Sequence, residues 1–285
     1  MRHPASRRSD LGRRGLAQGL LGLAAFAGPA CAMATPRTKP ASRLPPDLAG
    51  AMMTFNEEFS AFVANPNGDG GWKTRYFHGD RTLGGNNEAQ FYADDTIGGS
   101  PFRVQDGVLE IAASRDQVAP GLPFRSGLLN SQTIFSQRLG YFEMRAQLPA
   151  GRGLWPAFWM LPNGGGWPPE IDVVEMLGQE PDVLYASVHW TEGQHKAVTD
   201  KIHVGDMAQG FHTYAVDWRE EEIRWYFDSR QIARAPTPRG LSEPMYLLLN
   251  LAVGGDGSWP GAPDRHTAFP ARMRVDWVRA FAHPR

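Results

Sequence analysis

The chain has 285 residues and a net charge of −1, with 21% charged and 42% hydrophobic residues. This composition is typical of a folded globular protein, and the near-neutral charge excludes nucleic-acid binding through a broadly basic surface. The single cysteine excludes a disulfide-stabilised scaffold and a zinc site built from cysteines.

Residues 1–34 have the three-part pattern of a secretory signal peptide. Five arginines and one aspartate precede or flank an apolar run over Gly19–Ala27, and small-x-small cleavage patterns follow within residues 30–34. The apolar run is too short to cross a bilayer. We therefore expect a secreted or periplasmic protein without a membrane span, exported by the general route or, through Arg13–Arg14, by the twin-arginine route. The alternatives are a disordered basic tail and a lipoprotein anchored through Cys31.

The rest of the chain divides into a short linker and one domain. Residues 35–48 are rich in proline, lysine and serine, which indicates a flexible linker. Residues 49–285 contain short, nearly alternating apolar segments separated by turn residues such as Asp106-Gly107. The predicted strands include Val108–Ala112, Gly140–Leu148, Ile223–Phe227, Tyr246–Ala252 and Met273–Phe281. We expect an all-β fold, a β-sandwich jelly roll of two packed antiparallel sheets.

Three acidic residues, Glu170, Asp172 and Glu175, lie within one segment rich in β-branched residues, which predicts a strand. On a strand, Glu170 and Asp172 share a face, whereas strict alternation would send Glu175 to the apolar face. A buried charge is costly there. A β-bulge at Val173-Val174 removes this conflict, because one extra residue returns Glu175 to the face of the other two acids.

Three carboxylates on one strand face are suited to the hydrolysis of a glycosidic bond. A retaining glycosidase needs two carboxyl groups roughly 5–5.5 Å apart. Like charges this close push their pKa values apart, so that one group stays protonated and acts as an acid. The alternatives are a calcium site and an exposed polar strand face. The second would crowd like charges without a local lysine or arginine to offset them.

The segment Glu170-x-Asp172-x-x-Glu175 resembles the catalytic signature of glycoside hydrolase family 16, in the bulged form of its laminarinase-type members. Similar segments follow the family order over roughly residues 53–282. They are Tyr141–Pro149, Gly153–Pro162, Phe211–Trp218, Ile223–Asp228, Asn250–Gly255 and Trp259–Gly261. This resemblance implies a concanavalin-like jelly roll with a substrate cleft, so that residues 49–285 would be a catalytic domain.

The resemblance also implies the reaction. Glu170 would be the nucleophile, Glu175 the general acid/base, and Asp172 would hydrogen-bond the nucleophile and tune its ionisation. The implied activity is retaining, endo-acting cleavage of a β-linked polysaccharide, foremost β-1,3- or mixed β-1,3/1,4-glucan. No cofactor is required for this chemistry, although a structural calcium ion on the outer face of the sheet is common in the family.

Eight further residues are candidates for substrate binding. The C–H face of a sugar stacks on indole, so we expect Trp155 in the cleft, and Trp159 in the core. His189 would bond Asp172 or the leaving sugar, or be a structural histidine. The full candidate set is Asn86, Glu88, Gln90, Trp155, Trp159, His189, Asn250 and Trp259.

The residues around the acids do not decide which polysaccharide is the substrate. Pro168-Pro169 and Met176 depart from many laminarinase-type members and resemble members that act on bacterial exopolysaccharides. A bacterial exopolysaccharide or a galactan is therefore the alternative substrate. A transglycosylase and a non-catalytic carbohydrate-binding module are the alternative functions, and we expect a monomer in each case.

Overall fold

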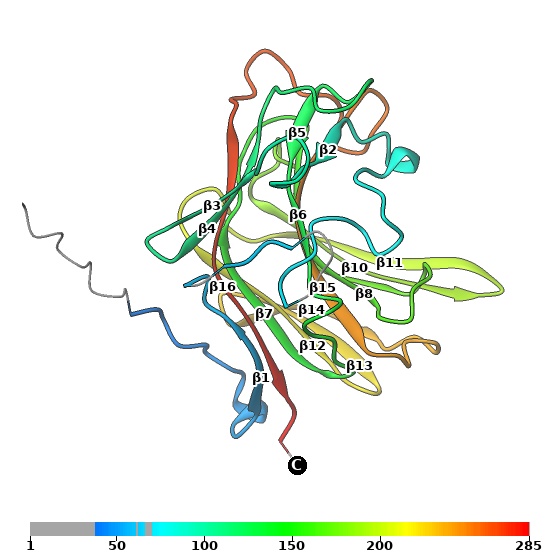
Figure 1. The fold of residues 1–285 in the computed structure, drawn as a ribbon. Helices are drawn as coiled ribbons and strands as arrows, with labels where there is room; N and C mark the ends of the chain where they lie inside the picture. Colours follow the sequence, from blue (N-terminus) through cyan, green and yellow to red (C-terminus); the bar gives the residue numbers. More distant parts are fainter. Residues whose placement is uncertain (1–37, 61, 66–69, 285) are drawn as a thin grey trace, which may run out of the picture. The chain divides into compact units, whose positions relative to one another are not determined.

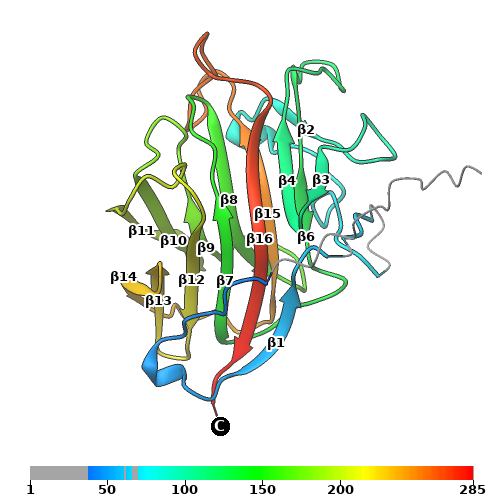
Figure 2. The same cartoon turned by 90° about the vertical axis from the view of Figure 1, so that its left-hand side faces the viewer.

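The computed structural model describes residues 38–60, 62–65 and 70–284. The prediction of a jelly roll is confirmed, because two antiparallel sheets pack face to face in this part of the chain (Figures 1 and 2). The predicted signal peptide, residues 1–34, lies outside the described residues. No helix in the described part has the length and hydropathy needed to cross a membrane.

The larger sheet has eight strands in the order β14-β13-β12-β7-β16-β4-β3, and β1 also pairs with β16. Its strands are β1 (Met52–Glu57), β3 (Phe102–Gln105), β4 (Val108–Ala113), β7 (Gly140–Gln147), β12 (His212–Trp218), β13 (Glu222–Phe227), β14 (Arg230–Pro236) and β16 (Ala271–Ala282). The long strand β16 runs near the middle, with β7 on one side and β4 and β1 on the other.

The smaller sheet has six strands in the order β11-β10-β9-β8-β15-β6. They are β6 (Leu128–Asn130), β8 (Leu154–Pro162), β9 (Glu170–Glu175), β10 (Val183–Glu192), β11 (Gln194–His203) and β15 (Met245–Val253). A parallel pair, β2 (Gln90–Tyr92) and β5 (Phe124–Ser126), and the short 3-10 turns η1 (Pro46–Leu48) and η2 (Gly84–Asn86) complete the fold.

Strand β15 shows how the alternation builds two apolar layers. Leu247, Leu249 and Leu251 belong to the main core, whereas Tyr246 and Leu248 belong to a second buried cluster. Both faces of β15 are therefore buried, and burial of so much apolar surface is the main stabilising contribution to such a sandwich. The second cluster lies on the face of the smaller sheet away from the main core.

The predicted linker is not a free segment where the structure describes it. Leu48 is fully buried beside Tyr141 and Phe281, and Asp47 accepts hydrogen bonds from Arg219, which follows β12, and from Arg224 of β13. Figure 2 shows this dark blue segment crossing in front of β16 and β7. The linker prediction is thus wrong for residues 38–48, because side chains distant in sequence give this stretch a packed surface to bind.

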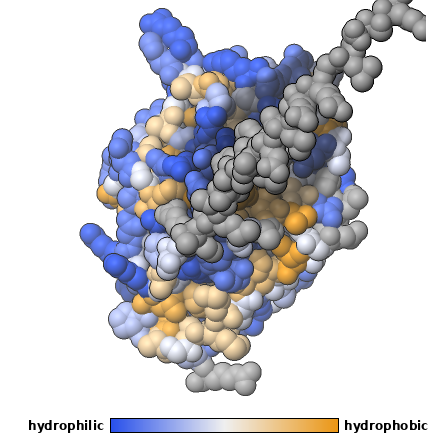
Figure 3. All heavy atoms as spheres, turned by 60° about the vertical axis from the view of Figure 1, so that its left-hand side comes forward, coloured by the Kyte–Doolittle hydropathy of each residue, from blue (hydrophilic) through white to orange (hydrophobic). Residues whose placement is uncertain are grey.

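The face drawn in Figure 3 mixes hydrophilic and hydrophobic residues, with a hydrophobic area in its lower part. Among the described residues, Met52 and Met53 of β1 are large hydrophobic side chains that remain exposed. Scattered exposed apolar residues of this kind are normal for a folded domain.

Candidate active site

Strand β9 carries the predicted β-bulge. Asp172 pairs with Ser187 of β10 and Glu175 pairs with Tyr185, so that Val173 and Val174 together stand opposite one residue. The register against β8 shifts at the same place. Val173 and Val174 both pack in the main core. The bulge is therefore confirmed, and all three acids line one cavity on the other face of the sheet.

The bulge is supported from the opposite sheet. The Nε1 atom of Trp225, on β13, donates a buried hydrogen bond of 2.8 Å to the backbone carbonyl of Asp172. A bulge disrupts the regular ladder locally, and a buried carbonyl without a partner would be costly. The indole of Trp225 thus stabilises the backbone conformation that places Glu175 beside the other acids.

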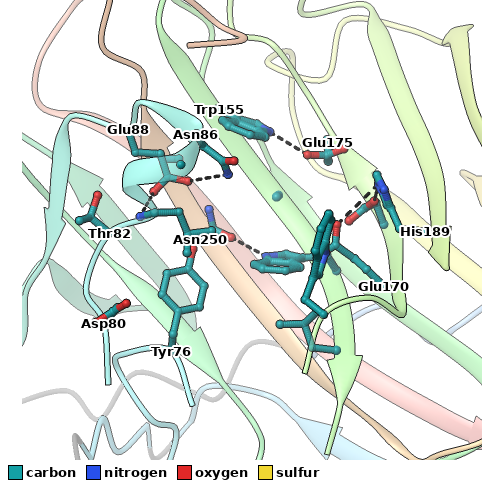
Figure 4. Close-up of a pocket in the computed structure, with 18 of the residues that line it drawn as sticks. Tyr76, Asp80, Thr82, Asn86, Glu88, Trp155, Glu170, Glu175, His189 and Asn250 are labelled. Carbon is teal, nitrogen blue, oxygen red and sulfur yellow. Dashed lines mark hydrogen bonds and ion pairs between the residues drawn. The ribbon is translucent and has the colours of Figure 1, made fainter. Parts of the chain in front are cut away.

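The cavity has a volume of about 660 Å³ and is open to one side of the smaller sheet. Strands β8, β9, β10 and β15 supply its floor, and the loop over residues 76–88 supplies a wall. Figure 4 shows Asp80, Thr82 and Glu88 of this loop lying across the cavity from Glu170 and Glu175. This volume lies within the range of roughly 300–1,000 Å³ common for ligand sites.

Each glutamate accepts a hydrogen bond from a tryptophan. Trp155 Nε1 donates to Glu175 Oε1 at 3.0 Å (Figure 4), and Trp167 Nε1 donates to Glu170 Oε2 at 3.0 Å. An N–H donor favours the ionised form of a carboxyl group and fixes its orientation. Because one oxygen of Glu175 accepts from Trp155, the other oxygen is the one that would carry an acidic proton.

Asp172 lies between the glutamates and next to a pair of histidines. Nε2 of His189 lies 3.3 Å from Asp172 Oδ2 and 3.7 Å from Glu170 Oε1. Nδ1 of His189 lies 3.1 Å from Nε2 of His195 on the neighbouring strand β11. His195 also packs against the ring of Trp167, with 4.8 Å between ring centroids. His189 thus lies beside the acids, as predicted. Of the two polar contacts predicted for it, with Asp172 or with the leaving sugar, the structure contains the contact with Asp172.

Burial dominates the electrostatics of the three acids. Burial raises the pKa of Glu170 well above its usual range, the charge of Asp172 adds to this, and His189 and Trp167 oppose it. Burial and the charge of Glu175 raise the pKa of Asp172, while a hydrogen bond with Glu170 lowers it. Burial raises the pKa of Glu175 to about 7. The cluster therefore retains protons near neutral pH, as a general acid requires.

The other predicted contacts fall into two groups. Asn86, Glu88, Trp155, Trp159, His189, Asn250 and Trp259 all line the cavity. Gln90 does not, because its fully buried amide donates to Glu88 at 2.6 Å and accepts from the backbone of Val253 at 2.7 Å. The prediction that Gln90 contacts substrate is therefore wrong. The Gln90 side chain instead positions Glu88 and connects this part of the chain to β15 through hydrogen bonds.

Trp159 and Asn250 form a buried pair in the cavity floor. Trp159 Nε1 donates to Asn250 Oδ1 at 2.7 Å, and Asn250 donates to the hydroxyl of Tyr92 at 3.0 Å. Trp159 is 9% exposed and packs in the second buried cluster, as the core interpretation predicted. Trp155 is only partly buried and contacts Trp259 edge to face, which leaves two indoles at the cavity surface.

Several lining residues were not predicted from the sequence. They are Tyr76, Phe77, His78, Asp80, Thr82, Trp167, Ser187 and Thr199, with His195 directly behind His189. Trp167 is the most informative, because 55% of it is exposed and it contacts Glu170 directly. The sequence did contain a signal for Trp167. It is a tryptophan between glycines and prolines, three residues before the first acid.

With this geometry established, the sequence model of "Glycosyl hydrolases family 16" matches residues 89–279. The chain belongs to glycosyl hydrolase family 16. The match spans the three acids and the strands of both sheets that surround them. The family resemblance noted in the sequence is therefore confirmed.

Similar proteins include two from Rhizobium meliloti (strain 1021). Endo-1,3-1,4-beta-glycanase ExsH is 41% identical over 253 residues, which cover 84% of this chain and 54% of the relative. Endo-1,3-1,4-beta-glycanase EglC is 43% identical over 249 residues, covering 83% and 53%. This chain thus spans about half the length of these relatives.

Among solved structures, the laminarinase catalytic domain from Thermotoga maritima MSB8 matches with a TM-score of 0.70 and 31% identity. The match covers 82% of this chain and 99% of that domain. The jelly roll seen here is therefore similar to the fold of that laminarinase catalytic domain.

Proposed function

We propose that this chain is an endo-acting, retaining glycoside hydrolase that cleaves β-1,3- or mixed β-1,3/1,4-glucan. The observation that carries the proposal is the arrangement on β9, where Glu170, Asp172 and Glu175 share one face in a cavity. Membership of family 16 and the names of the two Rhizobium meliloti relatives support this class of reaction and substrate.

In the first step, Glu175 gives its proton to the glycosidic oxygen while the carboxylate of Glu170 attacks the anomeric carbon. The bond from that carbon to the leaving sugar breaks, and a glycosyl ester with Glu170 forms. The raised pKa of Glu175 supplies the proton near neutral pH. Trp167 and His189 stabilise the negative charge that Glu170 needs before attack.

In the second step, ionised Glu175 accepts a proton from water, and the water oxygen attacks the same carbon. The ester bond breaks, Glu170 leaves as a carboxylate, and the sugar keeps its original anomeric configuration. Asp172 would favour the return of this charge when it carries a proton itself, because its ionised form raises the pKa of Glu170. The catalytic cycle thus requires no metal and no cofactor.

The cavity lining suits a neutral sugar polymer, and the names of the relatives favour a glucan among these. Trp155, Trp167 and Trp259 present partly exposed indoles around the acids, and Trp259 is 45% exposed. Such faces stack on the C–H faces of a neutral sugar polymer. An open cavity suits cleavage within a long chain. The proposal includes export, because residues 1–34 have the pattern of a signal peptide, and it includes a monomer as the expected oligomeric state.

The first experiment is product release by the purified protein from a panel of polymers. The panel contains laminarin, mixed-linkage glucan, agarose, carrageenan and an acidic bacterial exopolysaccharide, with Glu170→Gln and Glu175→Gln run in parallel. We expect oligosaccharides from laminarin or mixed-linkage glucan, and a loss of at least about a thousandfold in either variant. Proton NMR of the first products should show retained β configuration.

Each other outcome changes the conclusion in a defined way. Cleavage of the exopolysaccharide or a galactan alone would replace the glucan but keep the reaction. Saturable binding without cleavage would favour a carbohydrate-binding protein. Longer oligosaccharides formed from shorter ones would identify a transglycosylase, and undiminished activity in either variant would refute the roles given to the two glutamates.

A further inference from the structure

The ammonium group of Lys39 lies in a site made of backbone oxygens on the outer side of the larger sheet. Its Nζ atom donates to the carbonyl of Glu58 at 2.6 Å, to that of Gly107 at 2.7 Å, and to that of Asp276. The Lys39 side chain is only 10% exposed. An ammonium group has three donors, and here three carbonyls accept them.

These three carbonyls come from distant parts of the chain. Glu58 directly follows β1, and Gly107 lies in the tight turn between β3 and β4. Asp276 is the extra residue where the register of β16 against β7 shifts, between Val275 and Trp277. Strand ends, turns and bulges leave carbonyls outside the regular ladder. The fold thus brings three carbonyl oxygens together at one point.

Two carboxylates add negative charge around the same point. Asp276 Oδ1 lies 3.4 Å from the Lys39 nitrogen, and Glu58 Oε2 lies 3.8 Å from it. A set of backbone carbonyls and carboxylate oxygens, without nitrogen or sulfur, is what a hard cation such as Ca²⁺ prefers. The donor atoms alone would therefore predict a site for a divalent cation.

A calcium ion does not fit while Lys39 is in place. The resemblance to family 16 implies that a structural calcium ion could bind on the outer face of the sandwich. The residues found at this point can be compared with the requirements of such an ion. The Lys39 nitrogen already lies at hydrogen-bond distance from the carbonyl oxygens that a metal would need. It is also a positive charge that would repel a second cation.

We propose that Lys39 acts as a built-in cation, which occupies an oxygen-lined site able to take Ca²⁺ once the lysine is removed. The lysine belongs to the segment before β1, so the same contacts hold this segment on the sheet. Arg279 of β16 assists, because it donates to the carbonyl of Pro40 at 2.9 Å and to Glu58 at 2.8 Å. The domain is thereby stabilised without a metal at this point.

The test compares the melting temperatures of the wild type, Lys39→Ala and Lys39→Met with a matched control. Arg43→Ala is suitable, because it removes one positive charge from the same segment at an exposed position outside the oxygen site. Each protein is melted with EDTA, with calcium chloride and with sodium chloride at equal ionic strength. Calcium binding is also measured by isothermal titration calorimetry.

We expect the wild type and Arg43→Ala to melt at the same temperature in all three solutions and to bind no calcium at this site. In EDTA, Lys39→Ala should melt roughly 4–10 °C lower, because several charge-assisted hydrogen bonds are lost. Calcium should restore part of this loss and bind with a stoichiometry near one. Sodium should not restore it.

Three results would overturn the proposal. The wild type could gain stability from calcium or lose it in EDTA, which would show that Lys39 does not replace the metal. Both Lys39 variants could melt like the wild type, or a destabilised variant could ignore calcium. If neither variant folds, the wild-type titration still decides, because calcium binding by the intact protein at this site contradicts the proposal. The readout does not depend on which glycan is cleaved.

Discussion

Nδ1 of His189 lies 3.1 Å from Nε2 of His195, across the adjacent strands β10 and β11. Two imidazole nitrogens at this distance share one proton. When His195 supplies that proton, neutral His189 must carry its own on Nε2, which faces Asp172. With the proton in that place, His195 is a positioning residue, because it holds His189 in the tautomer whose Nε2 proton points toward Asp172.

We predict that His195→Phe lowers kcat by about tenfold or less and leaves KM nearly unchanged, since one hydrogen bond behind the site is lost. The phenyl ring preserves the packing against Trp167. His203→Phe is the matched control, because His203 lies on the same strand and pairs with Asp182 outside the cavity. Equal effects of the two substitutions on kcat would refute the positioning role.

The hydrogen bond from Trp155 sets the alkaline limit of activity in a testable way. This bond lowers the pKa of Glu175, so Trp155→Phe should raise that pKa. The acid then keeps its proton to higher pH, and the alkaline limb of kcat/KM should move upward. Trp259→Phe, which changes a neighbouring indole, should leave the limb in place.

Trp167 has the corresponding effect on the other glutamate. Its hydrogen bond lowers the pKa of Glu170, so Trp167→Phe should raise that pKa and move the acidic limb of kcat/KM to higher pH. The nucleophile must be ionised, and fewer molecules would meet this condition at acidic pH. Movement of the alkaline limb instead would mean that the roles of Glu170 and Glu175 are reversed.

Glu175 also links stability to pH. Its pKa is about 7 in the folded protein, against 4.5 for an ordinary glutamate in water, so the folded state holds the proton more tightly. This contribution to stability is complete below about pH 4.5 and is lost as the pH rises through about 7. Ionisation therefore costs the folded state up to about 3 kcal/mol at pH 8.

Glu175→Gln should remove this cost, because an amide does not ionise. We expect the inactive variant to melt several degrees above the wild type at pH 8, and at nearly the same temperature at pH 4.5. Thermal unfolding followed by circular dichroism at both pH values measures the difference. A difference independent of pH would show that Glu175 does not titrate in this range.

The sequence was most informative where alternation and charge were in conflict. Three acids and two valines could share a strand without placing Glu175 in the apolar core only if Val173-Val174 formed a bulge, and they do. Trp167 could not be predicted in the same way. Its contact with Glu170 depends on the conformation of a glycine- and proline-rich loop, which has no periodic pattern to follow.

Two errors in the sequence interpretation have a common physical cause. Gln90 was placed in the cleft because its loop resembled a substrate-lining segment. Its amide oxygen instead accepts a hydrogen bond from the backbone N–H of Val253 on β15. Residues 38–48 have the composition of a linker, yet Lys39 and Leu48 contact residues more than 60 positions away. Composition reports local preference, whereas partners distant in sequence decide whether a segment is packed.

The hydrogen bond from Trp225 to the carbonyl of Asp172 limits how the hydrophobic interior of this protein can be redesigned. The spacing of the acids depends on a side chain from the opposite sheet, on the far side of the hydrophobic interior. Repacking that interior to improve heat resistance could shift the two sheets against each other by a fraction of an ångström. Turnover would then change although no residue at the cavity had been touched.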